Sequence, residues 1–167
     1  MATVQKITPN LWFDKNGEEA ARYYCSIFKD SSVGHISYYG KAGFEQHQMP
    51  EGTAMVVEFT LAGQSFLALN GGPIFKFSEA VSFVVNCDDQ QEVDHYWQKL
   101  SDGGDENAQM CGWLKDKFGL SWQIVPKRMS ELYASGNAEK SGRMMKAMMQ
   151  MKKLDIKKLE EAYEGNS

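Results

Sequence analysis

Hydrophobic and polar residues alternate in the N-terminal part of the chain, and this pattern predicts strands around a single helix. We expect strands, in chain order, at residues 7–13, 33–39, 55–61 and 65–70. Between the first two strands, residues 18–28 follow turn-forming residues and have a helical pattern. Ala62-Gly63 is typical of a tight hairpin. The predicted order is therefore β-α-β-β-β.

A second, shorter series of elements follows the break at Gly71-Gly72-Pro73 and the linker 74–79. Its helix begins at an acidic capping box formed by Asp89 and Glu92 and ends at Gly103-Gly104. One apolar stripe runs along this helix and consists of Val93, Tyr96, Trp97 and Leu100. We expect strands at 81–86, 109–112 and 120–125, with a turn segment at 113–118. The order is an abbreviated β-α-β-β-β, as in a duplicated module.

The C-terminal part has helical periodicity. Helices are predicted at 129–134, 138–151 and 155–163, and Asp155 is expected to cap the last one. The methionines at 144–151 form a flexible apolar surface that either covers the protein's own sheet or a dimer seam, or grips a partner or a ligand. The predicted organisation is a first module at 1–73, a second at 74–126 and a helical extension at 127–167, with the two modules forming one structural domain.

Composition narrows the class of protein. The chain has 167 residues, of which 43% are hydrophobic, and this is enough for a globular core. A net charge of −4 argues against nucleic acid as a partner. No apolar run approaches the roughly 20 residues that span a bilayer, and residues 1–13 lack a signal-peptide pattern, so we expect no membrane partner and a cytoplasmic location. The thiols of Cys25, Cys87 and Cys111 are expected to be reduced.

The stretch CGWLKDKFGLSWQIVP, from Cys111 to Pro126, joins a glycine turn to an aromatic strand. It resembles the D-P-x-G-x-x-x-E-L hairpin that closes a module in the vicinal-oxygen-chelate superfamily, which includes glyoxalase I, the bleomycin-resistance proteins and extradiol dioxygenases. Gln123 falls where the metal-binding members carry a glutamate. Asp116 is interpreted as the residue that stabilises the turn.

Four further segments extend the resemblance over nearly the whole chain: ITPNLWFDKNGEEAARYY, GQSFLALNGGPIFKF, AVSFVVNCDDQQEVDHYWQKL and MMKAMMQMKKLDIKKLEEAYEG. They are similar to the PhnB-like family, often labelled 3-demethylubiquinone-9 3-methyltransferase. The resemblance implies an α+β fold of two βαβββ modules, curled into a partly open barrel around a cleft, with the C-terminal helices outside. It also implies a homodimer and a small-molecule ligand.

In metal-dependent members of the superfamily, histidines and carboxylates come from the first and last strands of each module. The matching positions here are Thr8, Phe66 or Ala68, Ser82 and Gln123. None is a histidine or a carboxylate, and a lone glutamine amide cannot hold a divalent ion against water. We therefore predict no metal and no cofactor. His35, His47 and His95 are far apart in the sequence, so we expect no second metal site built from these histidines.

Strand parity gives a candidate lining for the pocket. Residues two apart share a face, so Thr8, Asn10 and Trp12 form one set, and Phe66, Ala68 and Asn70 another. Trp122 has the opposite parity to Gln123 and is expected to pack under the helices. The candidate ligand-binding residues are Asn10, Trp12, Phe66, Asn70, Ser82, Trp113 and Gln123.

Candidates for catalysis are few. Cys111 could form a thiolate with Lys115 nearby, and His47 lies beside Glu45 in the loop 43–50. Gly71-Gly72-Pro73 lies between two strands and is interpreted as a linker, whereas a methyl-donor site needs a glycine-rich loop on a doubly wound sheet.

The favoured hypothesis is a metal-free small-molecule-binding protein of the glyoxalase and bleomycin-resistance type. The alternative is an enzyme acting on a small aromatic or oxygen-rich metabolite: a lyase, an isomerase, a dioxygenase-like enzyme or, by the family label only, a methyltransferase.

Overall fold

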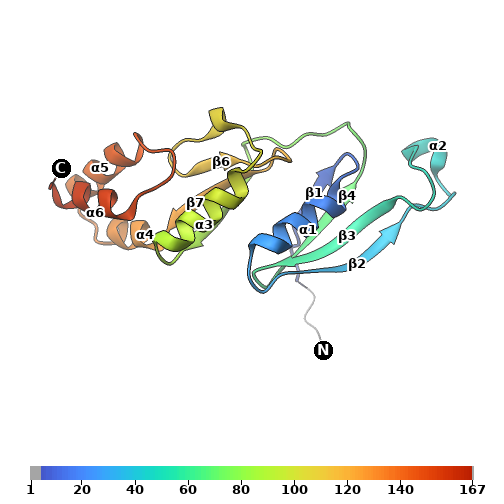
Figure 1. The fold of residues 1–167 in the computed structure, drawn as a ribbon, viewed down its shortest axis with the longest axis horizontal. Helices are drawn as coiled ribbons and strands as arrows, with labels where there is room; N and C mark the ends of the chain where they lie inside the picture. Colours follow the sequence, from blue (N-terminus) through green and yellow to red (C-terminus); the bar gives the residue numbers. More distant parts are fainter. Residues whose placement is uncertain (1–4, 167) are drawn as a thin grey trace. The chain divides into compact units, whose positions relative to one another are not determined.

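The computed structural model describes residues 5–166, and the chain divides into two compact units between Lys76 and Phe77. The predicted limits at residues 1 and 167 lie outside the described range. The first unit contains, in order, β1 (Asn10–Phe13), α1 (Gly17–Ile27), β2 (Ser32–Tyr38), α2 (Phe44–His47), β3 (Ala54–Leu61) and β4 (Gln64–Asn70) (Figure 1). Its strands have the order β1-β4-β3-β2, in which only the β1–β4 pair is parallel.

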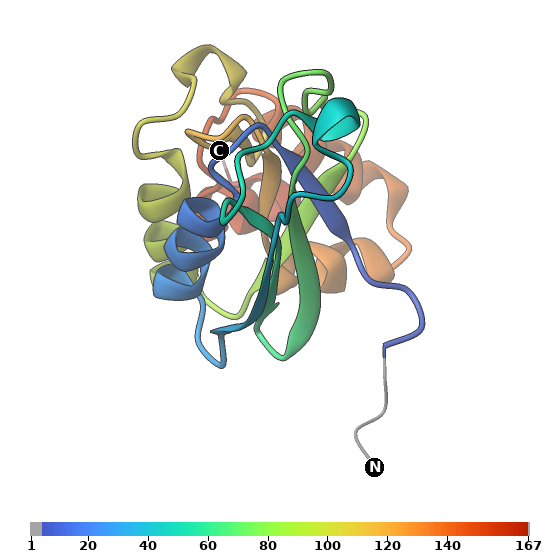
Figure 2. The same cartoon turned by 90° about the vertical axis from the view of Figure 1, so that its right-hand side faces the viewer.

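Helix α1 covers one face of this sheet (Figure 2). Tyr24 of α1 is fully buried and its ring stacks on that of Phe59, with 6.5 Å between the ring centroids. The small residues Ala20 and Ala21 allow the helix to approach the strands closely. The other buried apolar residues of this core are Leu11, Phe13, Ile27, Val57, Leu61, Phe66 and Ala68.

The predicted order of this unit is confirmed, with α2 as an addition inside the loop at 40–52. The hairpin between β3 and β4 has positive φ at Ala62 (47°) and Gly63 (79°), as a two-residue turn with the twist of its strands requires. In Figure 1, α2 lies at the far end of β2 and β3. Its caps, Gly43 and Gln48, both have left-handed backbone, which explains why hydrophobic periodicity did not indicate this single turn.

The second unit begins with β5 (Ser82–Cys87), α3 (Gln90–Ser101), η1 (Glu106–Ala108), β6 (Trp113–Lys115) and β7 (Ser121–Pro126). It ends with α4 (Lys127–Ala134), α5 (Ala138–Met148) and α6 (Ile156–Glu164). Within residues 77–166 the sheet order is β5-β7-β6, with β5 parallel and β6 antiparallel to β7. The predicted α+β fold class is confirmed, because both sheets are small and flanked by helices.

One element of the second unit differs from the prediction. The strand expected at 109–112 is instead one arm of a tight turn, and the strand β6 occupies residues assigned to the following turn segment. Met110 and Trp113 pair across the turn, while Cys111 (φ 55°) and Gly112 (φ 85°) both have left-handed backbone. The sheet described for residues 77–166 therefore has three strands, one fewer than in the first unit.

The predicted starts of α3 and α6 are confirmed by side-chain bonds. Asp89 Oδ1 accepts the N–H of Glu92 at 2.9 Å, and Glu92 Oε2 accepts the N–H of Asp88 at 2.7 Å. Asp155 Oδ1 accepts the N–H of Lys158 at 3.1 Å at the start of α6. These bonds satisfy N–H groups that have no partner within the helix.

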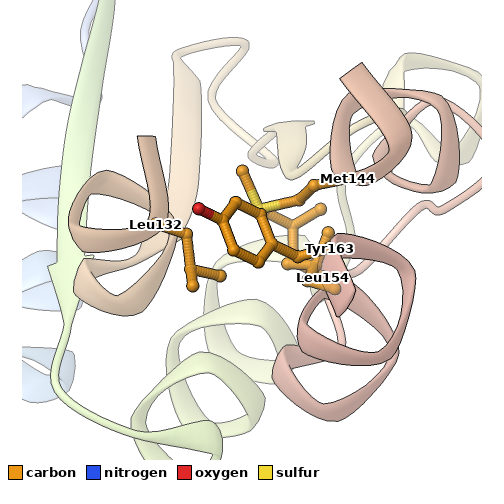
Figure 3. Packing of buried hydrophobic residues seen from close by; sticks show 5 residues of the cluster. Leu132, Met144, Leu154 and Tyr163 are labelled. Carbon is orange, nitrogen blue, oxygen red and sulfur yellow. The ribbon is translucent and has the colours of Figure 1, made fainter. Parts of the chain in front are cut away.

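The three C-terminal helices share a core and lie in the same unit as the second sheet. Tyr163 packs between Leu132, Met144 and Leu154 (Figure 3). The guanidinium of Arg143 on α5 donates to the carbonyl of Tyr163 at 2.8 Å and so caps the end of α6. In the part of the chain from 5 to 166, no helix has the length and apolar character to cross a bilayer.

Candidate functional site

Asn10 and Trp12 lie on the face of the first sheet that points away from α1, which we call the open face of that sheet. Their neighbours Leu11 and Phe13 are buried in the core under α1. Parallel register pairs Leu11 with Ala68 and Phe13 with Asn70, so the side chains of Phe66, Ala68 and Asn70 lie on the helix-covered face. This corrects the expectation that one pocket lining contains both sets.

The open face of the first sheet carries apolar residues that the sequence analysis did not select. Register pairs Asn10 with Leu67 and Trp12 with Leu69, and both leucines are half-buried. Glu58, on the neighbouring strand β3, pairs with Leu67 and is exposed. The alternation along 64–70 places Leu67 and Leu69 on one face and Phe66, Ala68 and Asn70 on the other. Parity alone does not say which of the two faces a helix covers.

Asn70 is occupied by structural hydrogen bonds. Its Oδ1 accepts the N–H of Gly17 at 2.8 Å, at the start of α1, and its Nδ2 donates to the carbonyl of Ala54 at 3.0 Å. The side chain is 1% exposed. Tyr39 Oη donates to the Asn70 carbonyl at 2.6 Å. Asn70 therefore joins α1, β3 and β4 instead of facing an open surface.

Trp12 is anchored by the glycines that follow β4. Its Nε1 donates to the carbonyl of Gly72 at 2.9 Å, and its ring meets that of Phe75 edge-on at 4.9 Å. A Cβ on Gly71 would lie 2.2 Å from Trp12 Cζ2, so only glycine fits there. The Gly71-Gly72 pair thus serves the packing of an indole, and Trp12 is held rigidly with part of its surface accessible.

The face of the second sheet that points away from α3 is called the open face of that sheet. It brings together Ser82, Trp113 and Gln123. Parallel and antiparallel register align Val84 of β5 and Trp113 of β6 on either side of Gln123 of β7. Gln123 Nε2 and Ser82 Oγ form a hydrogen bond of 2.9 Å. Val84 is 49% exposed, and Ser82, Trp113 and Gln123 are half-buried. Gln123 therefore lies between an aliphatic and an aromatic side chain, and its polar partner Ser82 lies two residues before Val84 on β5.

Trp122 points to the opposite, helix-covered face, as strand parity predicted. Its indole is 3% exposed and donates from Nε1 to Asp116 Oδ2 at 2.9 Å. Asp116 Oδ1 accepts the N–H groups of Phe118 and Leu120. The interpretation of Asp116 as a turn-stabilising residue is confirmed.

Lys115 shares the open face of the second sheet and forms an ion pair with Glu79. The hydrogen bond from Lys115 holds the pKa of the Glu79 carboxyl below its usual range. This pairing compensates the charge of Lys115 and engages the lysine that was considered as an activator of Cys111.

His47 is half-buried, and both of its ring nitrogens have partners. Nδ1 accepts the N–H of Met49 at 2.9 Å, which fixes the proton on Nε2, where it is donated to the carbonyl of Ala42 at 3.1 Å. The ring also lies 4.5 Å from that of Tyr39. These contacts assign His47 a role in shaping the loop around α2. Its catalytic role stays a prediction.

The three cysteines differ in environment. Cys111 is half-buried, and its N–H donates to the carbonyl of Met151 at 2.8 Å. Cys87 is fully buried on β5. Burial, with the nearby charges of Glu92 and Asp88, raises the pKa of the Cys87 thiol to about 12. Cys87 is therefore a packing residue that stays protonated at neutral pH.

A divalent metal ion does not fit the donors present. Thr8 precedes β1 and donates to the carbonyl of Gln5, Phe66 and Ala68 face the core, and Ser82 and Gln123 bond to each other. Among residues 5–166, no group of three or more histidine, cysteine or acidic side chains is close enough to hold a metal ion. Neutral amide and hydroxyl oxygens alone are poor ligands for such ions.

Two surface hollows of the second unit lie away from the open face. One of about 650 Å³ is lined by the end of α3 and the loop after it, including Trp97, Gly104 and Gln109. The other, of about 430 Å³, lies at the starts of α3 and α6 and includes Asp89, Asp155 and Arg128. Neither is lined by a candidate ligand-binding residue.

Comparisons with known proteins agree with the fold. A sequence model of the family described as 3-demethylubiquinone-9 3-methyltransferase matches residues 5–125. No curated protein matches the chain significantly. Among solved structures, the PhnB protein from Bacillus cereus is 35% identical, with 73% of this chain and 99% of that chain covered and a TM-score of 0.63.

Two further solved structures have lower identity. A protein from Pseudomonas aeruginosa is 19% identical, with coverage of 74% and 98% and a TM-score of 0.57, and it therefore supports the fold alone. A glyoxylase/bleomycin resistance protein/dioxygenase domain from Frankia is 11% identical, with coverage of 74% and 93% and a TM-score of 0.47.

Proposed function

The chain belongs to the 3-demethylubiquinone-9 3-methyltransferase family, and we propose that it uses this fold to bind a neutral small molecule without a metal ion. A family fold of this kind hosts unrelated chemistries, so the proposal rests on the residues of the site. The observation that carries it is the hydrogen-bonded pair of Gln123 and Ser82 on the open face of the second sheet.

This pair offers a ligand at least one hydrogen-bond donor and one acceptor. If Gln123 Nε2 donates one N–H to Ser82 Oγ, the serine hydroxyl hydrogen, the second amide N–H and Gln123 Oε1 remain for the ligand. If the amide is turned round, the serine donates to Oε1, and both amide N–H groups and a serine lone pair remain. Either way the complementary ligand edge carries an adjacent acceptor and donor, as in a lactam.

The neighbours of the pair favour a planar body on that ligand. Trp113 offers an indole on one side of Gln123 and Val84 an aliphatic surface on the other. The Lys115–Glu79 ion pair compensates the charge of the lysine on this face. A flat, uncharged ring system with a lactam-like edge satisfies both the stacking surface and the polar pair.

The test compares two probes that differ only in the polar edge: quinolin-2(1H)-one, a lactam, and 2-methoxyquinoline, which lacks the N–H donor. Binding is measured by calorimetry on the wild type, Gln123→Leu and Ser82→Ala, with Gln98→Leu on the exposed face of α3 as the matched control. We expect a preference for the lactam that each site variant reduces by about three- to tenfold, the worth of one hydrogen bond. Equal binding of both probes by all four proteins contradicts the proposal.

The homodimer that the family resemblance implies is part of the same proposal. Sedimentation of the untagged protein across a range of concentrations tests it, and a constant monomer mass contradicts it.

Turnover is tested separately: an enzyme converts the probe into a product, whereas a binding protein returns it unchanged at a stoichiometric ratio.

A further inference from the structure

The segment 151–156 leads from the end of α5 into the first residue of α6, and we call it the strap. It crosses the turn that precedes β6, where the N–H of Cys111 donates to the carbonyl of Met151 and the N–H of Gly112 to that of Lys152, both at 2.8 Å. The carbonyl of Gly112 accepts the N–H of Ile124 at 2.8 Å. The turn is therefore held between β7 on one side and the strap on the other.

Gly112 is required by the closeness of this contact. A Cβ there would lie 3.0 Å from the carbonyl oxygen of Ile124 and 3.1 Å from Leu154 Cδ1, and its φ of 85° disfavours other residues. Leu154, in the strap, is fully buried and belongs to the core of the C-terminal helices. The strap thus joins that core directly to the start of β6.

Gln90, at the start of α3, holds the strap from its other side. Its Nε2 donates to the carbonyl of Leu154 at 3.1 Å, and its Oε1 accepts the N–H of Ile156 at 2.8 Å. Lys153 adds an ion pair with Asp94 of the same helix at 2.5 Å. The amide of glutamine can donate and accept hydrogen bonds at the same time. Gln90 uses both functions on backbone atoms of the strap.

We infer that the strap, clamped by Gln90, is a positioning element for Trp113. Trp113 follows Gly112 directly and pairs with Met110 across the turn through two hydrogen bonds of 2.8 and 3.1 Å. The course of this turn determines where β6 begins and therefore where the Trp113 indole lies beside Gln123. The family model matches residues 5–125, so the matched part includes Gln90 and the turn but not the strap. The consequence for a ligand rests on the proposed function.

The test uses Gln90→Met, which keeps the length of the side chain and removes its two hydrogen bonds to the strap, together with the one that Nε2 donates to Asp94 at 3.0 Å. Gln91→Met, at the exposed neighbouring position, is the matched control. We expect amide hydrogen exchange of Cys111 and Gly112 to accelerate about tenfold in Gln90→Met only, because the strap then opens locally. With 5-fluorotryptophan labelling, the ¹⁹F resonance of Trp113 should shift or broaden, while those of the other three tryptophans stay unchanged.

Two results would overturn the inference. Equal exchange in both variants would show that Gln90 does not hold the turn. A faster exchange with an unchanged Trp113 resonance would show that the turn does not position the indole. These measurements need no ligand, so they separate this inference from the proposed function. If the lactam probe binds the wild type, Gln90→Met should weaken it about three- to tenfold through lost stacking, whereas Gln91→Met should not.

Discussion

The indole N–H of Trp122 donates to a carboxylate oxygen of Asp116 at 2.9 Å, and both side chains are almost fully buried. This bond joins the turn before β7 to the strand itself, while the second oxygen of Asp116 holds the backbone of Phe118 and Leu120. A buried carboxylate with several donors is a strong local tie, because each bond to a charged group is worth about 1.5–3 kcal/mol.

Asp116→Ala is therefore expected to lower the free energy of unfolding by about 2–4 kcal/mol, since it leaves buried donors without their acceptor. Chemical denaturation measures the loss. In a double-mutant cycle with Trp122→Phe, the two changes should be coupled by about 1–2 kcal/mol. If the losses of unfolding free energy in the two single variants simply add in the double variant, the hydrogen bond between Trp122 and Asp116 does not stabilise the fold.

Asn70 makes a similar prediction for the first unit. Asn70→Ala should lower the free energy of unfolding by about 2–4 kcal/mol, because the N–H of Gly17 and the carbonyl of Ala54 lose their buried partner. Asn10→Ala, on the exposed face of β1, is the control and should change stability by less than about 0.5 kcal/mol. Similar losses in both variants would show that Asn70 is not a structural residue.

Gly71→Ala tests the packing of Trp12. Because a Cβ would overlap the indole, we expect a loss of about 1–3 kcal/mol and a change in the fluorescence of Trp12 as its ring is displaced. Gly40→Ala is the matched control, since nothing lies within 4 Å of the added Cβ. Unchanged fluorescence and stability in Gly71→Ala would contradict the described contact.

Cys87 predicts a dependence of stability on alkaline pH. The folded state raises the pKa of this thiol from 9.0 to about 12, so its contribution to stability is complete below pH 9 and is lost as the pH rises from 9 towards 12. Within this window, the difference in unfolding free energy between the wild type and Cys87→Ala should shrink by about 1.4 kcal/mol per pH unit. Denaturation series at pH 8.0, 9.5 and 10.5 measure it, and parallel curves would refute it.

The sequence was sufficient for the elements whose ends are set by neighbouring residues. Asp89, Asp155 and the Ala62-Gly63 hairpin act through local bonds and dihedral angles, and each was predicted at the right place. Strand parity also grouped Phe66, Ala68 and Asn70 correctly on one face. Local rules could not show that α1 covers this face, since that depends on packing between distant segments.

The start of β6 could not be predicted for a related reason. Cys111 was expected to lie in a strand, but its left-handed backbone is stabilised by bonds from residues forty positions later in the chain. The polar pair of Gln123 and Ser82 was only partly visible: both residues were candidates, but their hydrogen bond depends on the parallel register of β5 and β7. Candidate chemistry was readable from residue types, whereas its geometry required the pairing of strands.

The strap holds the turn at Cys111 and Gly112 through its own carbonyl oxygens at positions 151 and 152. Every amino acid, proline included, carries that oxygen, so the residues at these two positions can change during evolution without loss of either bond. The constraint falls instead on the partners: a glycine at 112 and an amide at 90. Distant relatives could therefore retain this support while sharing no identical residue at 151 and 152, and a search for it should score these partner positions.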